Sequence, residues 1–253
     1  MVDKKNTRKK YFVRMSQPSD LQNILDFYKI NKHKNVRERD AAILKERADN
    51  GAIVLIEDEQ GKIVASSVSY THKVEKDGVE KTMWVEIGST RIAGLNGFPG
   101  VFDVMVTTQM FRAFLIEPPE DCFVGHMEHD FIQKTANRLG WRNVEPPEEL
   151  QKSSNKTVSN GDMTDRTKDW FRLGLEGMPI MTKYMMKVME NPVLKHVKTG
   201  EEIEMHFSKS MIFNLFKDNI ARFADMDFGS VDAPPPENNV RKHRDKWLKK
   251  HFR

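Results

Sequence analysis

Side chains suited to proton transfer gather in two parts of the chain. Glu86 stands in an apolar segment, and His126 and Glu128 stand at the end of another one. Successive side chains of a strand point to opposite faces, so His126 and Glu128 would share one face. Imidazoles and carboxylates are common general acids and bases. These three residues are therefore the candidates for catalysis.

The residues around His126 do not favour a metal site or a cysteine nucleophile. His126 and His129 form a His-x-x-His pair, but no third ligand clusters with them and Cys122 lies at no usual zinc spacing, so no metal site is expected. Cys122 lies in an apolar strand context without an assigned base, which favours a buried structural thiol over a nucleophile. A single cysteine cannot form an intramolecular disulfide, and a reducing, cytoplasmic compartment is expected.

The elements that must position these residues begin at the N-terminal end of the chain. Residues 11–15 predict a strand, and Ser19 and Asp20 offer N-cap oxygens to an amphipathic helix whose apolar residues recur at helical spacing. A second helix is expected at 41–48. Apolar strands at 52–57 and 62–71, joined by a tight turn, predict a hairpin.

The middle of the chain contains the strands that carry the candidate residues. A strand at 82–93 holds Glu86, and a glycine-rich loop at 94–100 follows it. A helix at 101–116, a strand at 122–127 and a helix at 131–139 complete this part. The pattern loosens after Trp141, and Gly140 ends the last helix.

The chain is divided into one large domain with appendages. We expect a basic tail at 1–10, a domain at 11–150, a linker at 151–168, a mostly helical extension at 169–232, and a proline-rich spacer with a basic tail at 233–253. Within the extension, helices are expected at 169–175, 179–191 and 211–223, and a strand at 203–207. Three methionines of the second helix, Met181, Met185 and Met189, form a stripe that indicates packing.

Charge is concentrated at the two ends of the chain. The 253 residues carry a net charge of +4, but the first ten residues carry +4 and residues 241–253 carry +6, so the body is acidic. This distribution disfavours a dedicated face for duplex nucleic acid, although the tails could contact nucleic acid or an acidic partner. No apolar run approaches the roughly 20 residues that span a bilayer, and residues 1–10 lack the apolar segment of a secretory signal.

The order of these elements resembles that of the GNAT superfamily of acyl-CoA N-acyltransferases over residues 10–150. Phe12-Val13-Arg14 before a helix headed by Asp20 is similar to the opening of these domains, and Leu139-Gly140-Trp141 is similar to the end of their last conserved helix. The resemblance implies an α/β (α+β) fold with a mixed central sheet, flanked by helices and splayed between its fourth and fifth strands. Acyl-CoA would lie in that wedge.

The resemblance also implies that the glycine-rich loop holds the pyrophosphate of acetyl-CoA or another acyl-CoA at a helix N-terminus. The residues that would form this site are Gly94, Gly97, Phe98, Gly100, Val101 and Phe102. The loop departs from the family pattern in two respects. The usual glutamine or arginine before the glycines is not clearly present, and Pro99 lacks an amide donor. A tight structural turn is the alternative interpretation.

The chemistry that the resemblance implies is attack of an amine on a thioester, which needs a base for the ammonium proton and an acid for the thiolate. Glu86 is the leading base, with its pKa expected to rise through partial desolvation. His126, Glu128 and His129 are its rivals. The tyrosine that many family members use as the acid is replaced here by Ala136.

Three functions therefore remain open from the sequence. The first is acyl-CoA dependent transfer to an amine, and the second is a catalytically degenerate scaffold that binds a partner through its extension and tails. The third is acylation of S-adenosylmethionine, because the segment around Glu86 and Arg91 is loosely similar to a strand of N-acyl homoserine lactone synthases. A homodimer is compatible with all three.

Overall fold

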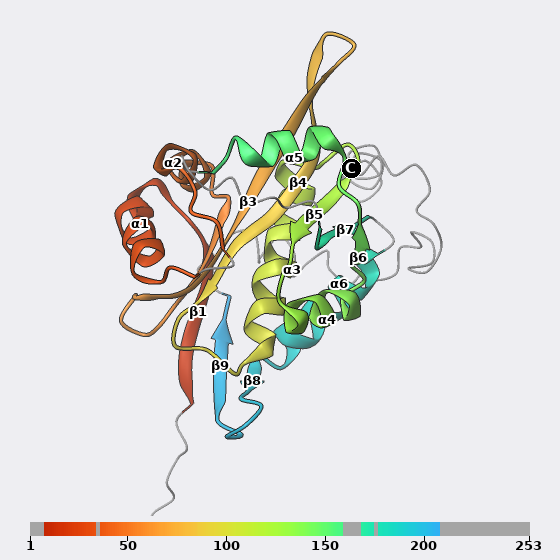
Figure 1. Cartoon of the computed structure of the whole chain (residues 1–253). Helices are drawn as coiled ribbons and strands as arrows, with labels where there is room; N and C mark the ends of the chain where they lie inside the picture. Colours follow the sequence, from red (N-terminus) through yellow and green to blue (C-terminus); the bar gives the residue numbers. More distant parts are fainter. Residues whose placement is uncertain (1–7, 34–35, 159–167, 175–176, 208–253) are drawn as a thin grey trace, which may run out of the picture.

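The computed structural model describes residues 8–33, 36–158, 168–174 and 177–207. The predicted helix at 211–223, the proline-rich spacer and the basic C-terminal tail lie outside the described residues. One mixed sheet of nine strands runs through the molecule in the order β6-β7-β5-β4-β3-β2-β1-β9-β8, and helices cover both of its faces (Figure 1). The α/β fold class is confirmed.

The N-terminal elements follow the predicted order. β1 (Lys9–Met15) leads through a 3-10 turn (Pro18–Asp20) into α1 (Leu21–Ile30) and α2 (Ala41–Asp49), and β2 (Ile53–Glu57) pairs antiparallel with β1. Asp20 makes no side-chain cap bond to α1. Instead its two oxygens accept hydrogen bonds from the guanidinium of Arg14, at 2.6 and 2.8 Å, which ties the start of α1 to β1.

The predicted hairpin is confirmed by the antiparallel pair of β2 and β3, and a second, longer hairpin follows it. β3 (Ile63–Lys76) pairs antiparallel with β4 (Val79–Ile92) from Ala65 and Ile92 at one end to Lys76 and Val79 at the other. Asp77 and Gly78 both have positive φ, as the two-residue turn of a tight hairpin requires. The tip of the hairpin projects beyond the other elements (Figure 1).

The elements after the hairpin build the second half of the sheet. α3 (Pro99–Ile116) leads to β5 (Cys122–His126), α4 (Asp130–Arg138) and β6 (Arg142–Val144). β4 and β5 are parallel neighbours. α3 and α4 appear close to their predicted bounds, whereas β6 lies in a segment expected to be irregular.

The region after β6 corrects the sequence prediction. α5 (Glu148–Asn155) stands where a loop was expected, and β7 (Trp170–Leu173) stands where helix was expected. β7 inserts between β5 and β6 and pairs antiparallel with both. Residues beyond the predicted domain end at 150 therefore belong to the central sheet.

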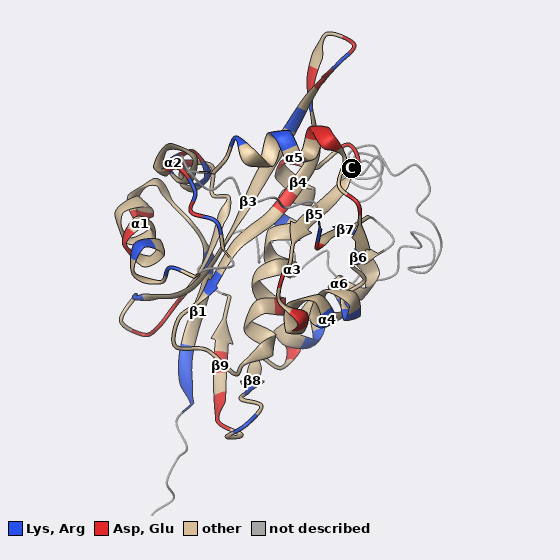
Figure 2. Cartoon of the chain, in the orientation of Figure 1, with Lys and Arg blue, Asp and Glu red and all other residues tan. Residues whose placement is uncertain are grey.

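The described part of the extension adds two strands to the opposite edge. α6 (Met178–Glu190) and β9 (Glu202–His206) confirm the predicted helix and strand, and β8 (Val193–Lys195) was not predicted. β9 pairs in parallel with β1, so Lys9 and Lys10 belong to the sheet and not to a free tail. Acidic residues of β9 lie beside basic ones of β1 (Figure 2), and Arg8 bridges Glu202 at 2.8 Å.

Two cores lie on opposite faces of the sheet. The larger one packs α3 and α6 against the sheet and contains Phe111, Phe114 and Trp141, all buried. The smaller one packs α1 and α2 against β2 and β3. No helix in the described ranges combines the length and apolarity needed to cross a bilayer.

Candidate active site

The central feature of the site is the parting of β4 from β5. The two strands pair through Trp84 and Cys122, Val85 and Phe123, and Glu86 and Val124. β4 continues to Ile92, while the last residues of β5 pair with β7 on the other side. A register shift against β3 near Ser66 and Val68, with a positive φ at Ser89, bends β4 just after the last pair.

The strand order adds the decisive observation. From β1 the sheet runs 1-2-3-4-5-7-6, and it parts between the parallel fourth and fifth strands, as the resemblance in the sequence implied. The chain has the GNAT fold. β8 and β9 are additions at the edge of that fold, on the far side of β1.

Comparison with known proteins finds likeness only among solved structures. No protein-family model and no curated protein matches the chain. N-acetylglutamate synthase from Neisseria gonorrhoeae is 16% identical with a TM-score of 0.47, and the match covers 64% of this chain and 35% of that one. The chain thus spans about a third of the length of the gonococcal protein.

Two smaller structures match over most of their length. Diaminobutyrate acetyltransferase EctA from Paenibacillus lautus is 10% identical with a TM-score of 0.42, and the match covers 65% of this chain and 94% of that one. Mosquito arylalkylamine N-acetyltransferase like 5b is 9% identical with a TM-score of 0.43, and the match covers 64% and 97%.

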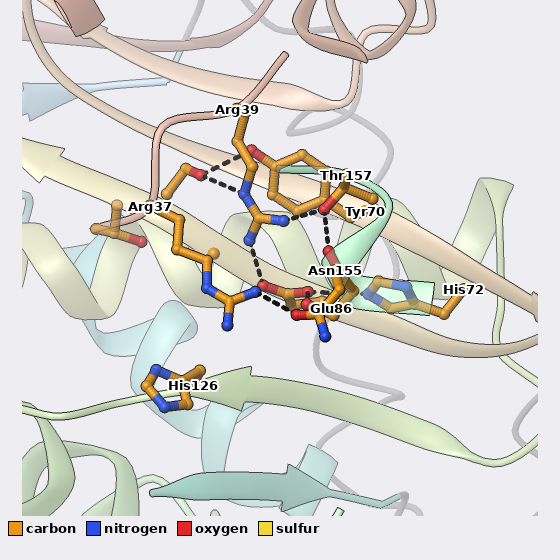
Figure 3. A network of polar contacts seen from close by, with 12 residues as sticks. Arg37, Arg39, Tyr70, His72, Glu86, His126, Asn155 and Thr157 are labelled. Atoms are coloured by element: carbon orange, nitrogen blue, oxygen red, sulfur yellow. Dashed lines mark hydrogen bonds and ion pairs between the residues drawn. The ribbon is translucent and has the colours of Figure 1, made fainter. Parts of the chain in front are cut away.

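Glu86 lies at the last β4–β5 pair and is the centre of a buried polar network (Figure 3). One carboxylate oxygen accepts a hydrogen bond from Arg39 at 2.6 Å. The other lies 2.9 Å from Nε2 of His72 and accepts a hydrogen bond from Ser154 at 3.0 Å. Glu86 is thus held from the loop before α2, from β3 and from α5.

These contacts change the expected protonation of Glu86. Burial alone would raise the pKa of the carboxyl, but the charge of Arg39 and the hydrogen bond from His72 outweigh it, so the pKa lies well below its ordinary value. The expected upward shift is therefore wrong in direction. A carboxylate that is ionised and bonded on both oxygens suits a positioning role better than that of a base, and its catalytic assignment stays a prediction.

The partners of Glu86 were not found from the sequence. Arg39 also lies over the ring of Tyr70, 4.1 Å from the ring centroid, and donates from Nε to Ser89 at 3.3 Å. His72 lies 3.0 Å from Ser153 of α5 through Nδ1. Alternation along β3 and β4 could have indicated that Tyr70 and His72 share the face of Glu86, but nothing local identifies α5 as their cover.

His126 lies apart from this network, on β5 (Figure 3). Its side chain is 8% exposed, its Nδ1 is 3.7 Å from the Glu128 carboxylate, and its ring packs edge-on against Trp170. Val124, which pairs with Glu86, is two residues earlier, so His126 shares the face of Glu86 but lies where the strands have parted. His129 is instead the N-cap of α4, where its Nδ1 accepts from the amide of Phe131.

The glycine-rich loop leads from the end of β4 into the first turn of α3, as expected. Gly94 and Gly97 have positive φ, and Phe98 is buried. The loop is also packed by the extension: a side chain at Gly97 would collide with His196, and one at Gly100 would meet Leu194 of β8 at 2.7 Å. Val197 donates its amide to the carbonyl of Gly97 at 2.9 Å.

The residues present fit an acyl-CoA in part. The first turn of α3, which includes Val101 and Phe102, begins with Pro99 and has no side-chain cap. Val101 already donates its amide to the carbonyl of Phe98 at 3.0 Å, and the other amides of a helix N-terminus are the kind of donors that bind phosphate. His196 and Leu194 of the extension pack against Gly97 and Gly100, which restricts the approach of a ligand to the loop from the side of the extension. The assignment of the six loop residues to the cofactor stays a prediction.

Two further residues are placed without an active role. Ala136 lies in α4 and is buried in the large core, so that helix offers no hydroxyl at this position. Cys122 is buried between α5 and the sheet, with Trp84 and Leu150 in the same apolar cluster. Burial raises the pKa of its thiol to about 12, which agrees with an inert thiol.

Proposed function

We propose that the protein transfers an acyl group, with acetyl as the favoured group, from acyl-CoA to the amine of a small molecule. The observation that carries the proposal is the parting of β4 and β5 after Glu86, because within the described residues it leaves the edge of β4 from Ile87 to Ile92 without a strand partner on that side. Unpaired backbone groups of such an edge can bind an extended ligand by hydrogen bonds.

The reaction forms one bond and breaks one. The amine nitrogen attacks the thioester carbonyl, an amide forms, and the carbon–sulfur bond breaks to release the CoA thiolate. The ammonium proton goes to a base before or during attack. His126 fits this task better than Glu86, because imidazoles are common general bases and both carboxylate oxygens of Glu86 already have partners.

The thiolate needs little help from an acid. A free thiol has a pKa of about 8.5, so it leaves as a thiolate or takes a proton from water without a large barrier. The absence of a hydroxyl at Ala136 is therefore compatible with turnover.

Binding and turnover test the proposal separately. Isothermal titration of the full chain with acetyl-CoA, and with longer acyl-CoAs, should show saturable binding. Release of CoA thiol should then depend on an added amine, and the panel of amines should include S-adenosylmethionine to test the lactone synthase alternative. Absence of binding to every acyl-CoA would overturn the proposal.

A degenerate scaffold is the second candidate, and the packing at the site favours it. Glu86 is saturated by three partners, and β8 with its turn packs on the glycine-rich loop. A partner would then bind through the C-terminal tail, whose charge of +6 suits an acidic surface. Deletion of residues 238–253 should abolish partner binding and leave the melting temperature unchanged; retained binding would argue against the tail.

A further inference from the structure

A small cavity lies on the face of the sheet that α1 and α2 cover. Its volume is about 170 Å³, and its walls come from α1, from α2 and the segment before it, and from the bent part of β4. Ligand pockets for drug-sized molecules are commonly about 300–1,000 Å³. The cavity is therefore too small for acyl-CoA and suits the head group of a small molecule.

The wall of the cavity is strongly basic. Five of its lining residues are cationic and one is acidic: Lys29, Lys32, Arg37, Arg39 and Arg91 against Glu38. Arg39 is matched by Glu86 at 2.6 Å, and Glu38 is already bridged to Lys32 at 2.6 Å. An excess of positive charge remains, which favours an anion in the cavity.

Arg91 differs from most of the arginines whose side chains are largely buried in the described residues; Arg37, which is also buried, donates to the side chain of Asn155 at 2.8 Å. Arg14, Arg39, Arg47 and Arg112 each bridge to a carboxylate. Arg91 is 5% exposed and has no carboxylate partner in the described part of the chain. It donates to the backbone carbonyls of Tyr28, at 3.1 Å, and Asn31, and its Nε has no hydrogen-bond partner.

The charge of Glu38 acts on Arg91 without a direct ion pair between the two side chains, and a buried guanidinium without a directly bonded carboxylate is costly. Burial accordingly lowers the pKa of Arg91 from its ordinary value. A carboxylate or phosphate in the cavity would supply both the missing charge and acceptors that match the guanidinium geometry. The surroundings of Arg91 therefore suit an ion pair in which the ligand supplies the negative charge.

The cavity also lies on β4 a short distance beyond the point where β4 and β5 part. Ser89 and Arg91 line it, and Ser89 is three residues beyond Glu86 on β4, or about 10 Å along a strand. α3 and the glycine-rich loop lie at the other face. A molecule held in the cavity would reach the parting of β4 and β5 from the side opposite α3.

We propose that this cavity binds the anionic group, a carboxylate or a phosphate, of the amine that the protein acylates. The inference rests on the proposed function for the identity of the ligand as an acceptor. Arg91 is its main anchor, and Lys29 strengthens the local field. The acceptor is accordingly a small amine that carries an acidic group, and a simple alkylamine is a poor substrate.

Three short primary amines test this inference: β-alanine with a carboxylate, phosphoethanolamine with a phosphate, and propylamine with neither. Titration of the full chain without acyl-CoA should detect one or both acidic amines and not propylamine. With acetyl-CoA present, kcat/KM should be about tenfold or more higher for the acidic amine, as expected for a charge-assisted hydrogen bond. Which acidic amine is preferred identifies the group.

Variants locate the binding. Arg91→Met should raise KM for the acidic amine about tenfold or more and raise KM for propylamine much less, while Arg91→Lys should restore part of the loss. Lys29→Ala, at an exposed position, should weaken binding less, and it keeps the test decisive if Arg91→Met does not fold. Lys45→Ala is the matched control, because Lys45 is exposed on α2 and does not line the cavity.

The outcomes separate this inference from the proposed function. Binding of an acidic amine without any acyl transfer would support the cavity and contradict the transferase. Transfer to propylamine as efficient as transfer to both acidic amines would overturn the cavity and leave the transferase intact. Unchanged binding in both Arg91→Met and Lys29→Ala would also overturn the cavity.

Discussion

The two faces of the central sheet are filled by different chemistry. On the α3 face, apolar side chains such as Phe111 and Phe114 pack into one large core. On the α1 and α2 face, the smaller core borders the Glu86 network and the basic cavity. The difference indicates that the α3 face supplies much of the stability, whereas the other face holds charged groups in fixed positions at a cost in desolvation.

Truncation of the apolar face should have the largest effect. Phe111→Ala removes a side chain that is 1% exposed, and we expect a loss of about 3–5 kcal/mol in the free energy of unfolding. Urea denaturation measures it. Phe131→Ala, at a position 48% exposed, is the control and should change stability by less than about 0.5 kcal/mol. A loss below about 1 kcal/mol for Phe111→Ala would contradict the assigned role of this core.

Removal of the carboxylate from the polar face should rank second. Glu86→Gln leaves Arg39 buried without its counter-charge, and we expect a loss of about 3 kcal/mol at neutral pH. Glu80→Gln, on the same strand but exposed and bridged to Lys73, should cost less than about 1 kcal/mol. Equal effects of the two substitutions would show that the network around Glu86 contributes little.

The pH dependence of this loss has a defined sign. The pKa of Glu86 is lowered in the folded protein, so its contribution is complete above the ordinary value of 4.5 and declines as the pH falls below it toward the folded pKa. The difference between wild type and Glu86→Gln should therefore be constant from pH 7 to about pH 5 and shrink in more acid solution. Chemical denaturation at each pH measures it.

His126 offers the sharpest separation of catalysis from stability. His126→Asn removes the proposed base, and acyl transfer should fall about a hundredfold while the melting temperature changes little. His129→Asn is the matched control, since His129 lies exposed at the start of α4. If Glu86→Gln abolished transfer in folded protein and His126→Asn did not, the base would be Glu86.

The sequence predicts the α3 face better than the polar face, and the reason is the range of the contacts. Periodic apolar residues and a glycine-rich loop are local signals, so α3 was predicted almost to its bounds. Glu86 could be proposed from its place on a strand. Its partners Arg39 and Ser154 lie 47 and 68 residues away, and no local pattern connects them.

Two of the missed elements, β7 and α5, have local causes as well. β7 has only four residues, and a short apolar run does not distinguish strand from helix. α5 follows Pro146 and Pro147 and is mostly polar, which suggested a loop; yet Pro147 is its N-cap residue, and Leu150 is its buried contact. Because α5 covers Glu86, the loss of this element from the prediction also hid the network.

Labelling of Cys122 in the native protein should be the smallest of these effects, and its rate reports whether α5 stays packed over the polar face. With a pKa of about 12, only about one thiol in ten thousand is ionised at pH 8, so a thiol reagent should label native protein far more slowly than protein in guanidinium chloride. The chain has one cysteine, so the denatured sample gives a full-scale reference. Because Leu150 of α5 packs in the same cluster as Cys122, fast labelling of protein with native circular dichroism would mean that α5 opens locally. Slow labelling means that α5 holds Ser154 on Glu86 in the resting protein, and that the polar face is closed on this side.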